Sequence, residues 1–199
     1  EFRRVLFRSY TDIMALANKG VKVAVDHSPG VGSQITVNLG ASDKLTIAQV
    51  QKILASASTT DAFHFNGPGG GDATLSLSAG NSDLGSLFAA GVNLTSVANA
   101  GFALLKSATG SLSLTLRQEV ALFNAGIHFA PGDTVQIQLQ TGASTGNTLA
   151  DVVTAAQNNA LAANIFVKAP GATLTISATQ ADALMNARVA FVNTDLVTL

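Results

Sequence analysis

The histidines are the first residues whose placement could support chemistry. His64 lies in Phe-His-Phe and His128 in Ile-His-Phe, and Lys22 holds a similar place in Val-Lys-Val. A pair of histidines on an open face would suit metal binding or pH-dependent binding. The repeat described below separates the two by about four strands, or roughly 19 Å, which is too far for shared coordination. We therefore interpret both as polar residues at the solvent positions of a half-buried sheet.

The glycine-rich run Gly67–Asp72 is the second candidate, as a phosphate-binding loop. It lacks the Lys-Ser/Thr that ends such a loop, and it precedes a predicted strand, whereas a phosphate loop opens a helix. It is also not a tandem calcium-binding nonapeptide, Gly-Gly-x-Gly-x-Asp-x-apolar-x, because the residues after Asp72 do not repeat the pattern. We interpret the run as a flexible hairpin link.

The carboxylates do not form a catalytic set in this sequence. Glycoside hydrolysis needs two paired carboxylates, and the candidates are single aspartates and Glu119, which we expect on a helix surface. A calcium site needs several converging oxygen ligands, and the sequence shows no such cluster. His27 has Ser and Asp neighbours, but these residue types are common throughout the chain. The aspartates near strand ends and turns are expected to bond the local backbone: Asp26, Asp43, Asp61, Asp133 and Asp195.

The aromatic residues do not favour a glycan-binding face. Such a face needs exposed rings, whereas the following phenylalanines are expected to pack in the core: Phe63, Phe65, Phe129 and Phe191. We therefore predict no catalytic, cofactor-binding or metal-ligating residues, no cofactor, and a protein that is not an enzyme.

Charge and composition give little indication of a partner. Residues 1–9, EFRRVLFRS, resemble the translation of a sequencing adapter and lack the periodicity of the rest, so we treat them as an artefact. Without them, 8 basic and 11 acidic residues remain, a net charge of −3. This weak negative charge does not favour nucleic acid or an anionic membrane. No apolar run reaches the roughly 20 residues that span a bilayer.

Three segments carry the same helix-start signal. In each, a hydroxyl residue precedes Gln by three positions, and an apolar pair follows one turn later: Thr46 with Gln49, Thr115 with Gln118, and Ser177 with Gln180. The hydroxyl accepts a hydrogen bond from the backbone N–H of Gln, and the Gln side chain accepts one from the backbone N–H of the capping residue. This pair of bonds is a capping box. Each segment predicts the start of a helix whose apolar face points to one side.

A second type of helix start alternates with the first. Thr11-Asp12-Ile13 and Ser82-Asp83-Leu84 match position for position, each ending in a glycine cap, Gly20 or Gly91. Thr148 with Asp151 is a weaker third copy. Helix starts are therefore expected near residues 11, 46, 82, 115, 148 and 177, at a spacing of about 33 residues.

Short alternating strands flank every predicted helix, and alternation indicates burial on one face only. Strands entering a helix are predicted at 35–39, 74–78, 112–116, 135–139 and 174–176, and strands leaving one at 21–25, 63–65, 92–94, 127–129, 165–167 and 189–191. The links between them hold Pro-Gly pairs typical of type II turns, so they could form hairpins. The fold class expected is α/β: a solenoid-like array of about six ββα units, with helices on one face of a mixed sheet, as a single array over residues 10–199.

The alternation of a Thr/Ser-Asp-Ile/Leu-x-x-Leu-x-x-x-Gly-Val unit with a Leu-Thr-Ile/Leu-x-x-Gln-x-x-x-Leu unit resembles the tandem repeats of very large secreted bacterial proteins. These are adhesin-like or haemolysin-type exoproteins, often with calcium-binding repeats elsewhere. The resemblance covers about residues 10–199, and it implies a stalk or spacer in an extracellular or cell-surface protein. The link Gly67–Gly71 and the insertion Ala98–Ser107 depart from the tight spacing.

The expected function is therefore structural or adhesive and non-enzymatic. Neighbouring repeats of the same chain are the expected partners, together with cell-surface or matrix components, but no nucleic acid and no membrane span. The alternatives are a calcium- or carbohydrate-binding module that uses the turns at the strand ends, and a non-catalytic part of a surface-associated enzyme.

Overall fold

The chain has a mixed α/β fold that divides into two compact units, unit 1 (Glu1–Lys106) and unit 2 (Ser107–Leu199). The structure, a computed structural model, describes residues 10–18, 35–56, 63–77, 83–89, 92–140, 146–162, 164–169, 171 and 173–199. The single array predicted over residues 10–199 remains a prediction. No helix in these ranges is both long enough and apolar enough to cross a bilayer.

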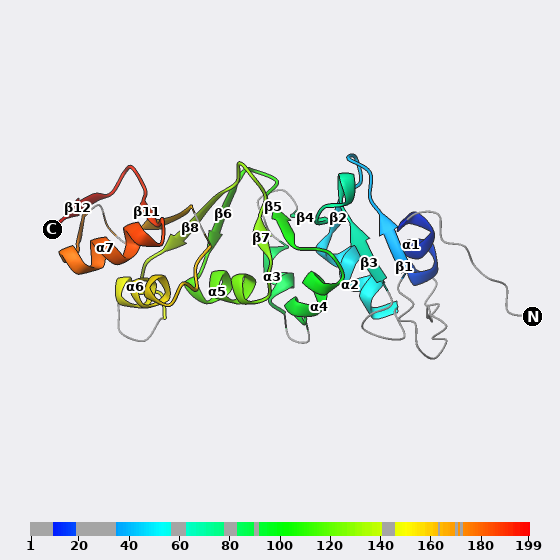
Figure 1. The fold of residues 1–199 in the computed structure, drawn as a ribbon, viewed down its shortest axis with the longest axis horizontal. Helices are drawn as coiled ribbons and strands as arrows, with labels where there is room; N and C mark the ends of the chain where they lie inside the picture. Colours follow the sequence, from blue (N-terminus) through cyan, green and yellow to red (C-terminus); the bar gives the residue numbers. More distant parts are fainter. Residues whose placement is uncertain are drawn as a thin grey trace, which may run out of the picture. The chain divides into compact units, whose positions relative to one another are not determined.

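Unit 1 contains two parallel groups of strands (Figure 1). Strand β1 pairs with β3, with Val37 opposite Phe65, and β4 pairs with β2 on one side and β5 on the other. Helices α1 and α2 pack against each other. The elements of unit 1 are α1 (Tyr10–Asn18), β1 (Ile35–Asn38), β2 (Leu45–Thr46), α2 (Ile47–Ser56), β3 (Phe63–Asn66), η1 (Pro68–Gly70), β4 (Thr74–Ser76), α3 (Leu84–Leu87), α4 (Leu94–Asn99) and β5 (Leu104–Lys106).

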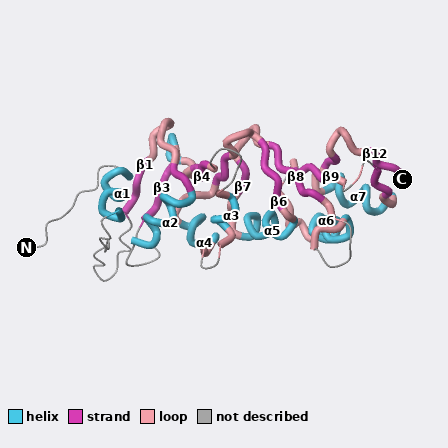
Figure 2. Tube along the Cα trace, turned by 180° about the vertical axis from the view of Figure 1, so that it is seen from behind, coloured by secondary structure: helices cyan, strands magenta, loops and turns pink. Residues whose placement is uncertain are grey.

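Unit 2 contains a parallel sheet in the order β6-β8-β9-β11 and a separate parallel pair, β10 and β12. Helices α5 and α6 lie on one side of the strands β6 and β8, and the view from behind shows the same arrangement (Figures 1 and 2). The elements of unit 2 are β6 (Ser111–Leu114), α5 (Leu116–Asn124), β7 (His128–Phe129), β8 (Thr134–Gln138), α6 (Leu149–Gln157), β9 (Ile165–Lys168), β10 (Thr173–Thr175), α7 (Ala178–Asn186), β11 (Ala190–Phe191) and β12 (Leu196–Thr198).

The strands segregate their side chains as alternation predicts. In β6, Leu112 and Leu114 are buried while Ser111 and Ser113 are exposed. Strands β3, β4, β5, β8 and β9 show the same alternation of buried and more accessible residues. Since the apolar side chains of parallel neighbours stand in one row, burying each row removes several aliphatic groups from water at once, at roughly 25 cal/mol per Å² of apolar surface. The prediction of strands buried on one face is confirmed.

The predicted capping boxes are also confirmed. Thr115 and Gln118 exchange two hydrogen bonds at the start of α5, and Ser177 and Gln180 do so at the start of α7. Thr46 and Gln49 make the same exchange at the start of α2. The weaker copy, Thr148 with Asp151, is a full capping box in which the Asp151 carboxylate accepts the Thr148 N–H at 2.9 Å. Each box satisfies backbone N–H groups that the first turn of a helix leaves unpaired.

Replacing Thr115 with alanine is expected to destabilise unit 2 by about 1 kcal/mol, because the Gln118 N–H loses its hydroxyl acceptor. Chemical denaturation followed by circular dichroism measures the change. Thr154→Ala is the matched control, because its hydroxyl bonds back to the Ala150 carbonyl within α6 and is not a cap; its effect should stay within about 0.5 kcal/mol. A loss from Thr154→Ala equal to that from Thr115→Ala would contradict the capping account.

The mixed sheet and the hairpins predicted before β4, β8 and β10 are wrong, because the pairs β1–β3, β2–β4, β4–β5, β6–β8, β8–β9, β9–β11 and β10–β12 are all parallel. The first strand of the hairpin predicted between 21–25 and 35–39 lies outside the described residues. Strand β8 pairs with β6 and β9, so the Pro131–Asp133 turn before it closes no hairpin. Strand β4 likewise pairs with β2 and β5 rather than with β3, which precedes it in the chain. Parallel strands need a crossover connection, and a helix lies between the members of each pair. The turn residues reverse the chain without setting two strands side by side.

The segment 92–107 also differs from the prediction. The strand expected at 92–94 is wrong: Asn93 caps helix α4 and accepts the Ser96 N–H at 3.0 Å. The apparent insertion Ala98–Ser107 holds the end of α4 and strand β5, which continues the parallel sheet. Strands β2 and β12 were not predicted either. The strand expected at 21–25 and the caps at Gly20 and Gly91 lie outside the described residues.

Candidate functional site

A buried carboxyl group in α5 is the most unusual side chain in the described part of the chain. Glu119 is 0 % exposed and lies on the same helix face as Leu116 and Leu122, which are also buried. Its place follows from the capping box at Thr115. Residues three positions apart lie on the same face of a helix, so Glu119 faces the sheet together with Leu116 and Leu122. The expectation of Glu119 at a helix surface is wrong.

The two oxygens of Glu119 have different surroundings. Oε1 accepts the backbone N–H of Ala162 at 2.7 Å. Oε2 is buried and has no hydrogen-bond partner among the residues described. Burial raises the pKa of Glu119 from 4.5 to about 7, and the Ala162 N–H opposes that rise. Because an ionised carboxylate buried with one donor is costly, the neutral acid is the form that the folded unit accommodates at acidic pH.

The other helices show what this position normally holds. Counted from their capping residues, the fourth residue is Val50 in α2 and Val152 in α6, 1 % and 0 % exposed. In α7 it is Ala181. Glu119 therefore stands at a position where these helices carry a small apolar residue, which is buried in α2 and α6. Aligning the capping boxes in the sequence would have revealed the substitution, but its charge made a surface position the simpler interpretation.

Asn147 is a second buried polar residue in unit 2, at 3 % exposure. Its Oδ1 accepts the N–H of Leu116, the first residue of α5, and its Nδ2 donates to the Gln138 carbonyl at 2.7 Å. One side chain therefore satisfies the start of a helix and the end of strand β8 together. Nothing in the local sequence indicates this long-range role.

Two of the predicted turn aspartates act over long range. The Asp195 carboxylate accepts the Ala169 N–H at 2.6 Å, and the Asp133 carboxylate accepts the Ser107 N–H. In both cases a turn carboxylate bonds the backbone at the end of an earlier strand. Asp43 instead bonds locally, accepting the Gly40 N–H at 2.8 Å, as predicted. Asp26 and Asp61 lie outside the described residues.

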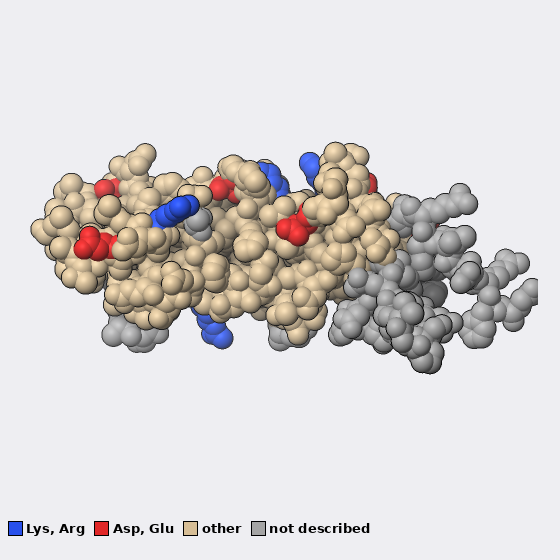
Figure 3. Space-filling model, in the orientation of Figure 1, with Lys and Arg blue, Asp and Glu red and all other residues tan. Residues whose placement is uncertain are grey.

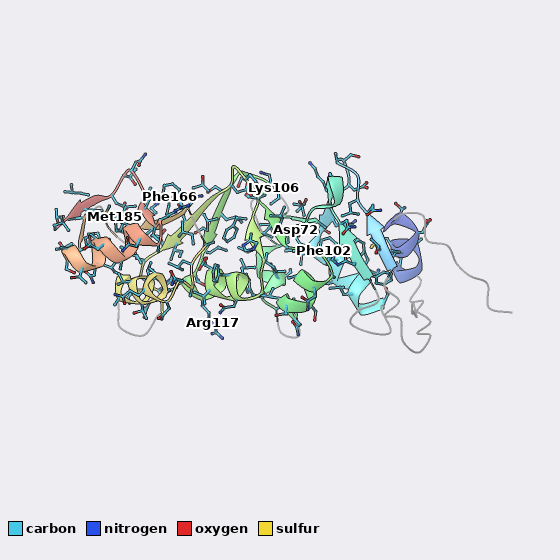
Figure 4. The ribbon with its side chains drawn as sticks, viewed as in Figure 1. Asp72, Phe102, Lys106, Arg117, Phe166 and Met185 are labelled. Atoms are coloured by element: carbon cyan, nitrogen blue, oxygen red, sulfur yellow. The ribbon has the colours of Figure 1, made fainter. Side chains whose placement is uncertain are left out.

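The solvent face of the sheet β6-β8-β9-β11 carries a row of unlike side chains. Register places Ser113, Gln136, Phe166 and Ala190 side by side on successive strands. Phe166 is half-buried on β9, and Figure 4 shows it there. On the face seen in Figure 3, the charged side chains of the described residues are scattered singly and do not form a patch.

The other sequence candidates are not brought together. His64 is half-buried on β3, with Nδ1 3.3 Å from the Asn99 carbonyl oxygen, and His128 is exposed on β7 in the other unit. His27 and Lys22 lie outside the described residues. The residues described contain no group of three or more His, Cys, Asp or Glu side chains that could hold a metal ion.

The glycine-rich run forms a closed loop and not a hairpin link. Its 3-10 turn η1 has the Gly67 N–H bonded to the Gly71 carbonyl at 2.6 Å, and a single antiparallel bridge joins Asn66 to Asp72. The run precedes strand β4, as predicted. Of the phenylalanines expected in the core, Phe63 and Phe65 are 1 % exposed, but Phe129 and Phe191 are half-buried.

Comparison with protein-family models, curated proteins and solved structures found no match for this chain.

Proposed function

We propose that the chain is a non-enzymatic structural segment, an array of stacked strand–helix coils that acts as a spacer in a large secreted or surface-attached bacterial protein. The observation that carries the proposal is the parallel pairing of successive strands across one helix. Leu112 pairs with Val135, Val135 pairs with Ile165, and Val167 pairs with Phe191. Each strand and the helix that follows it therefore form one coil of the chain, and each new coil adds one strand to the sheet.

Such stacking favours a scaffold over a single site. In a stacked array each coil buries its apolar row mainly against its neighbours, so stability is distributed along the chain. Side chains also repeat between coils: Asn66 Nδ2 donates to Asn38 Oδ1 at 3.0 Å, and the hydroxyls of Thr175 and Thr198 lie 3.2 Å apart. These contacts tie equivalent positions of adjacent coils, which is what a spacer requires.

Recovery of the complete reading frame tests this proposal. We expect further copies of the capping box at a spacing of about 33 residues on either side of this sequence. Cell fractionation with surface proteolysis should then place the protein outside the cell. An intracellular enzyme of ordinary length with one active site would contradict the proposal.

A carbohydrate-binding module is a second candidate, favoured by the row around Phe166. A pyranose ring stacks on an aromatic face, and the register places the Gln136 side chain on one side of Phe166 and the small Ala190 on the other. An amide beside an accessible ring offers hydrogen bonds to sugar hydroxyls. The calcium alternative has no comparable feature among the described residues.

A glycan array followed by calorimetry tests this candidate. If it holds, Phe166→Ala should weaken binding about tenfold, equivalent to about 1.4 kcal/mol of stacking. Arg117→Ala is the control, because Arg117 is exposed on α5 and should leave binding unchanged. Binding that is unaffected by Phe166→Ala would exclude the row as a site, and calorimetry with calcium tests the remaining alternative.

A further inference from the structure

The core position occupied by Glu119 is the only one of its kind that is ionisable in the capped helices described. Val50 and Val152 fill the matching positions of α2 and α6, both fully buried, and Ala181 holds that of α7. A valine there contributes favourable burial, whereas a carboxyl group costs free energy unless it is neutral and hydrogen-bonded. The Glu119 carboxyl therefore destabilises the core of unit 2 when it is ionised and much less when it is neutral and hydrogen-bonded.

The turn after α6 is the element that contacts this carboxyl. Helix α6 ends at Gln157, with Asn158 as its C-cap. The chain then passes through Asn159, with φ 51°, to Ala162, whose N–H donates to Glu119 Oε1 at 2.7 Å. Leu161 in the same turn is buried. The other carboxyl oxygen is buried without a partner among the described residues. The turn and the carboxyl therefore share a single hydrogen bond in an apolar setting.

Among the described residues, no cation of α5, α6, β6 or the turn after α6 faces Glu119. Helix α5 itself carries Arg117, which is exposed and points away from the unit (Figure 4). Helix α6 carries only Asp151, whose carboxylate is bonded to its own cap, Thr148. Strand β6 and the turn after α6 contain no charged residue. Burial and the Ala162 N–H are the two causes of the Glu119 pKa shift, and neither is an opposite charge.

We propose that Glu119 and the Asn158–Ala162 turn form a pH-dependent latch in unit 2: the neutral acid keeps the turn packed on α5, and ionisation of the acid releases it. An ionised carboxylate needs several donors, and the Ala162 N–H supplies one. Water can supply the others only when the turn moves away. The latch does not depend on what the chain binds, so its test is independent of the test of the spacer proposal.

The direction of the pH effect follows from the two states of the carboxyl. In the unfolded or released state Glu119 ionises near pH 4.5, and in the packed state near pH 7. Stability is therefore greatest at pH 4.5 and below, falls as the pH rises from about 4.5 to about 7, and is level above that. Asp151 acts in the opposite direction, because its hydrogen bonds to Thr148 lower its pKa. The stability that ionised Asp151 contributes is present above the ordinary pKa of an aspartate and is lost only as the pH falls below it.

The first experiment measures the stability of the full chain between pH 4 and 8 by denaturation, with Glu119→Gln as the comparison. Relative to that variant, the unfolding equilibrium constant of unit 2 should increase roughly 150-fold between pH 4.5 and 8, as follows for a carboxyl that ionises near pH 4.5 when unfolded and near pH 7 when packed. Asp182→Asn is the matched control, because Asp182 is exposed on α7 and should leave the profile unchanged. Glu119→Val, which restores the residue of the sister helices, should be more stable than the native chain at pH 8.

The second experiment needs no variant. Carbon-13 NMR of the native chain should show a glutamate carboxyl titrating near pH 7, and corrected amide exchange at Ala162 should accelerate above that pH before the β6 amides do. A carboxyl that titrates near 4.5, a native profile parallel to that of Glu119→Gln, or exchange at Ala162 that does not change with pH would each overturn the latch. If Glu119→Gln fails to fold, the titration and exchange measurements still decide.

Discussion

Replacing Gly101 with alanine is expected to destabilise unit 1 by more than about 4 kcal/mol or to prevent its folding. Gly101 has φ +97°, a conformation that residues with a Cβ rarely adopt, and a Cβ placed there would overlap the carbonyl oxygen of Phe65 and lie 2.9 Å from its carbon. The obstacle is backbone of strand β3, so it cannot rotate away. The Phe65 N–H also donates to the Ala100 carbonyl at 2.8 Å, and the Ala73 N–H to the Gly101 carbonyl at 2.9 Å.

Gly69→Ala separates the two causes of this expected loss. Gly69 lies in the same unit with φ +75°, but a Cβ there would meet nothing within 4 Å. It should therefore lose only the left-handed backbone preference, about 1–2 kcal/mol. Urea denaturation of both variants, followed by circular dichroism, gives the comparison. If Gly101→Ala costs no more than Gly69→Ala, the close approach to Phe65 is not what fixes glycine at this position.

Replacing Asn147 with alanine is expected to destabilise unit 2 by about 2–6 kcal/mol. The change leaves two buried backbone groups without partners, the Leu116 N–H and the Gln138 carbonyl, and each costs about 1–3 kcal/mol. It also disconnects the start of α5 from the end of β8. Amide exchange should show the loss first at the first turn of α5.

Asn124→Ala is the control for this prediction, because Asn124 is exposed at the end of α5 and its replacement should change stability by at most about 0.5 kcal/mol. Asn147→Asp adds a second comparison. The neutral acid keeps an acceptor for the Leu116 N–H and an O–H that can donate to the Gln138 carbonyl, so its cost should lie below that of alanine at acidic pH. The cost should rise as the carboxyl ionises, because the ionised form has no donor for that carbonyl. Equal losses from Asn124→Ala and Asn147→Ala would show that the bridge does not matter.

The sequence predicts what depends on neighbouring residues. The capping boxes at Thr115 and Ser177 are local, since both partners lie within one turn, and the structure has them as predicted. Alternation in strands such as β6 is equally local, and it correctly assigns Leu112 to the core. The helix α4 was missed because Val92–Leu94 alternates like a strand, although Asn93 is a good capping residue.

The sequence does not predict contacts between residues that lie far apart in the chain. A Pro-Gly turn reverses the chain whether or not the flanking strands pair, so the parallel register of Leu112 with Val135 cannot be inferred from it. The partners of Asn147 are set by the fold, and its amide alone does not indicate them. The charge of Glu119 favours a surface position, so the prediction for it was wrong. Only its position four residues after the cap Thr115 indicates that it lies in the core.

The parallel pairing of like with like has a consequence for folding. Each strand meets a neighbour with nearly the same pattern, as in Asn38 opposite Asn66 and Thr175 opposite Thr198. A strand that pairs with a different neighbour of the same pattern still covers its apolar row, so isomers with shifted pairing compete with the native one. Residues that have no counterpart in the neighbouring strand–helix segments, Glu119 and Asn147 among them, are then the ones that disfavour a wrong pairing.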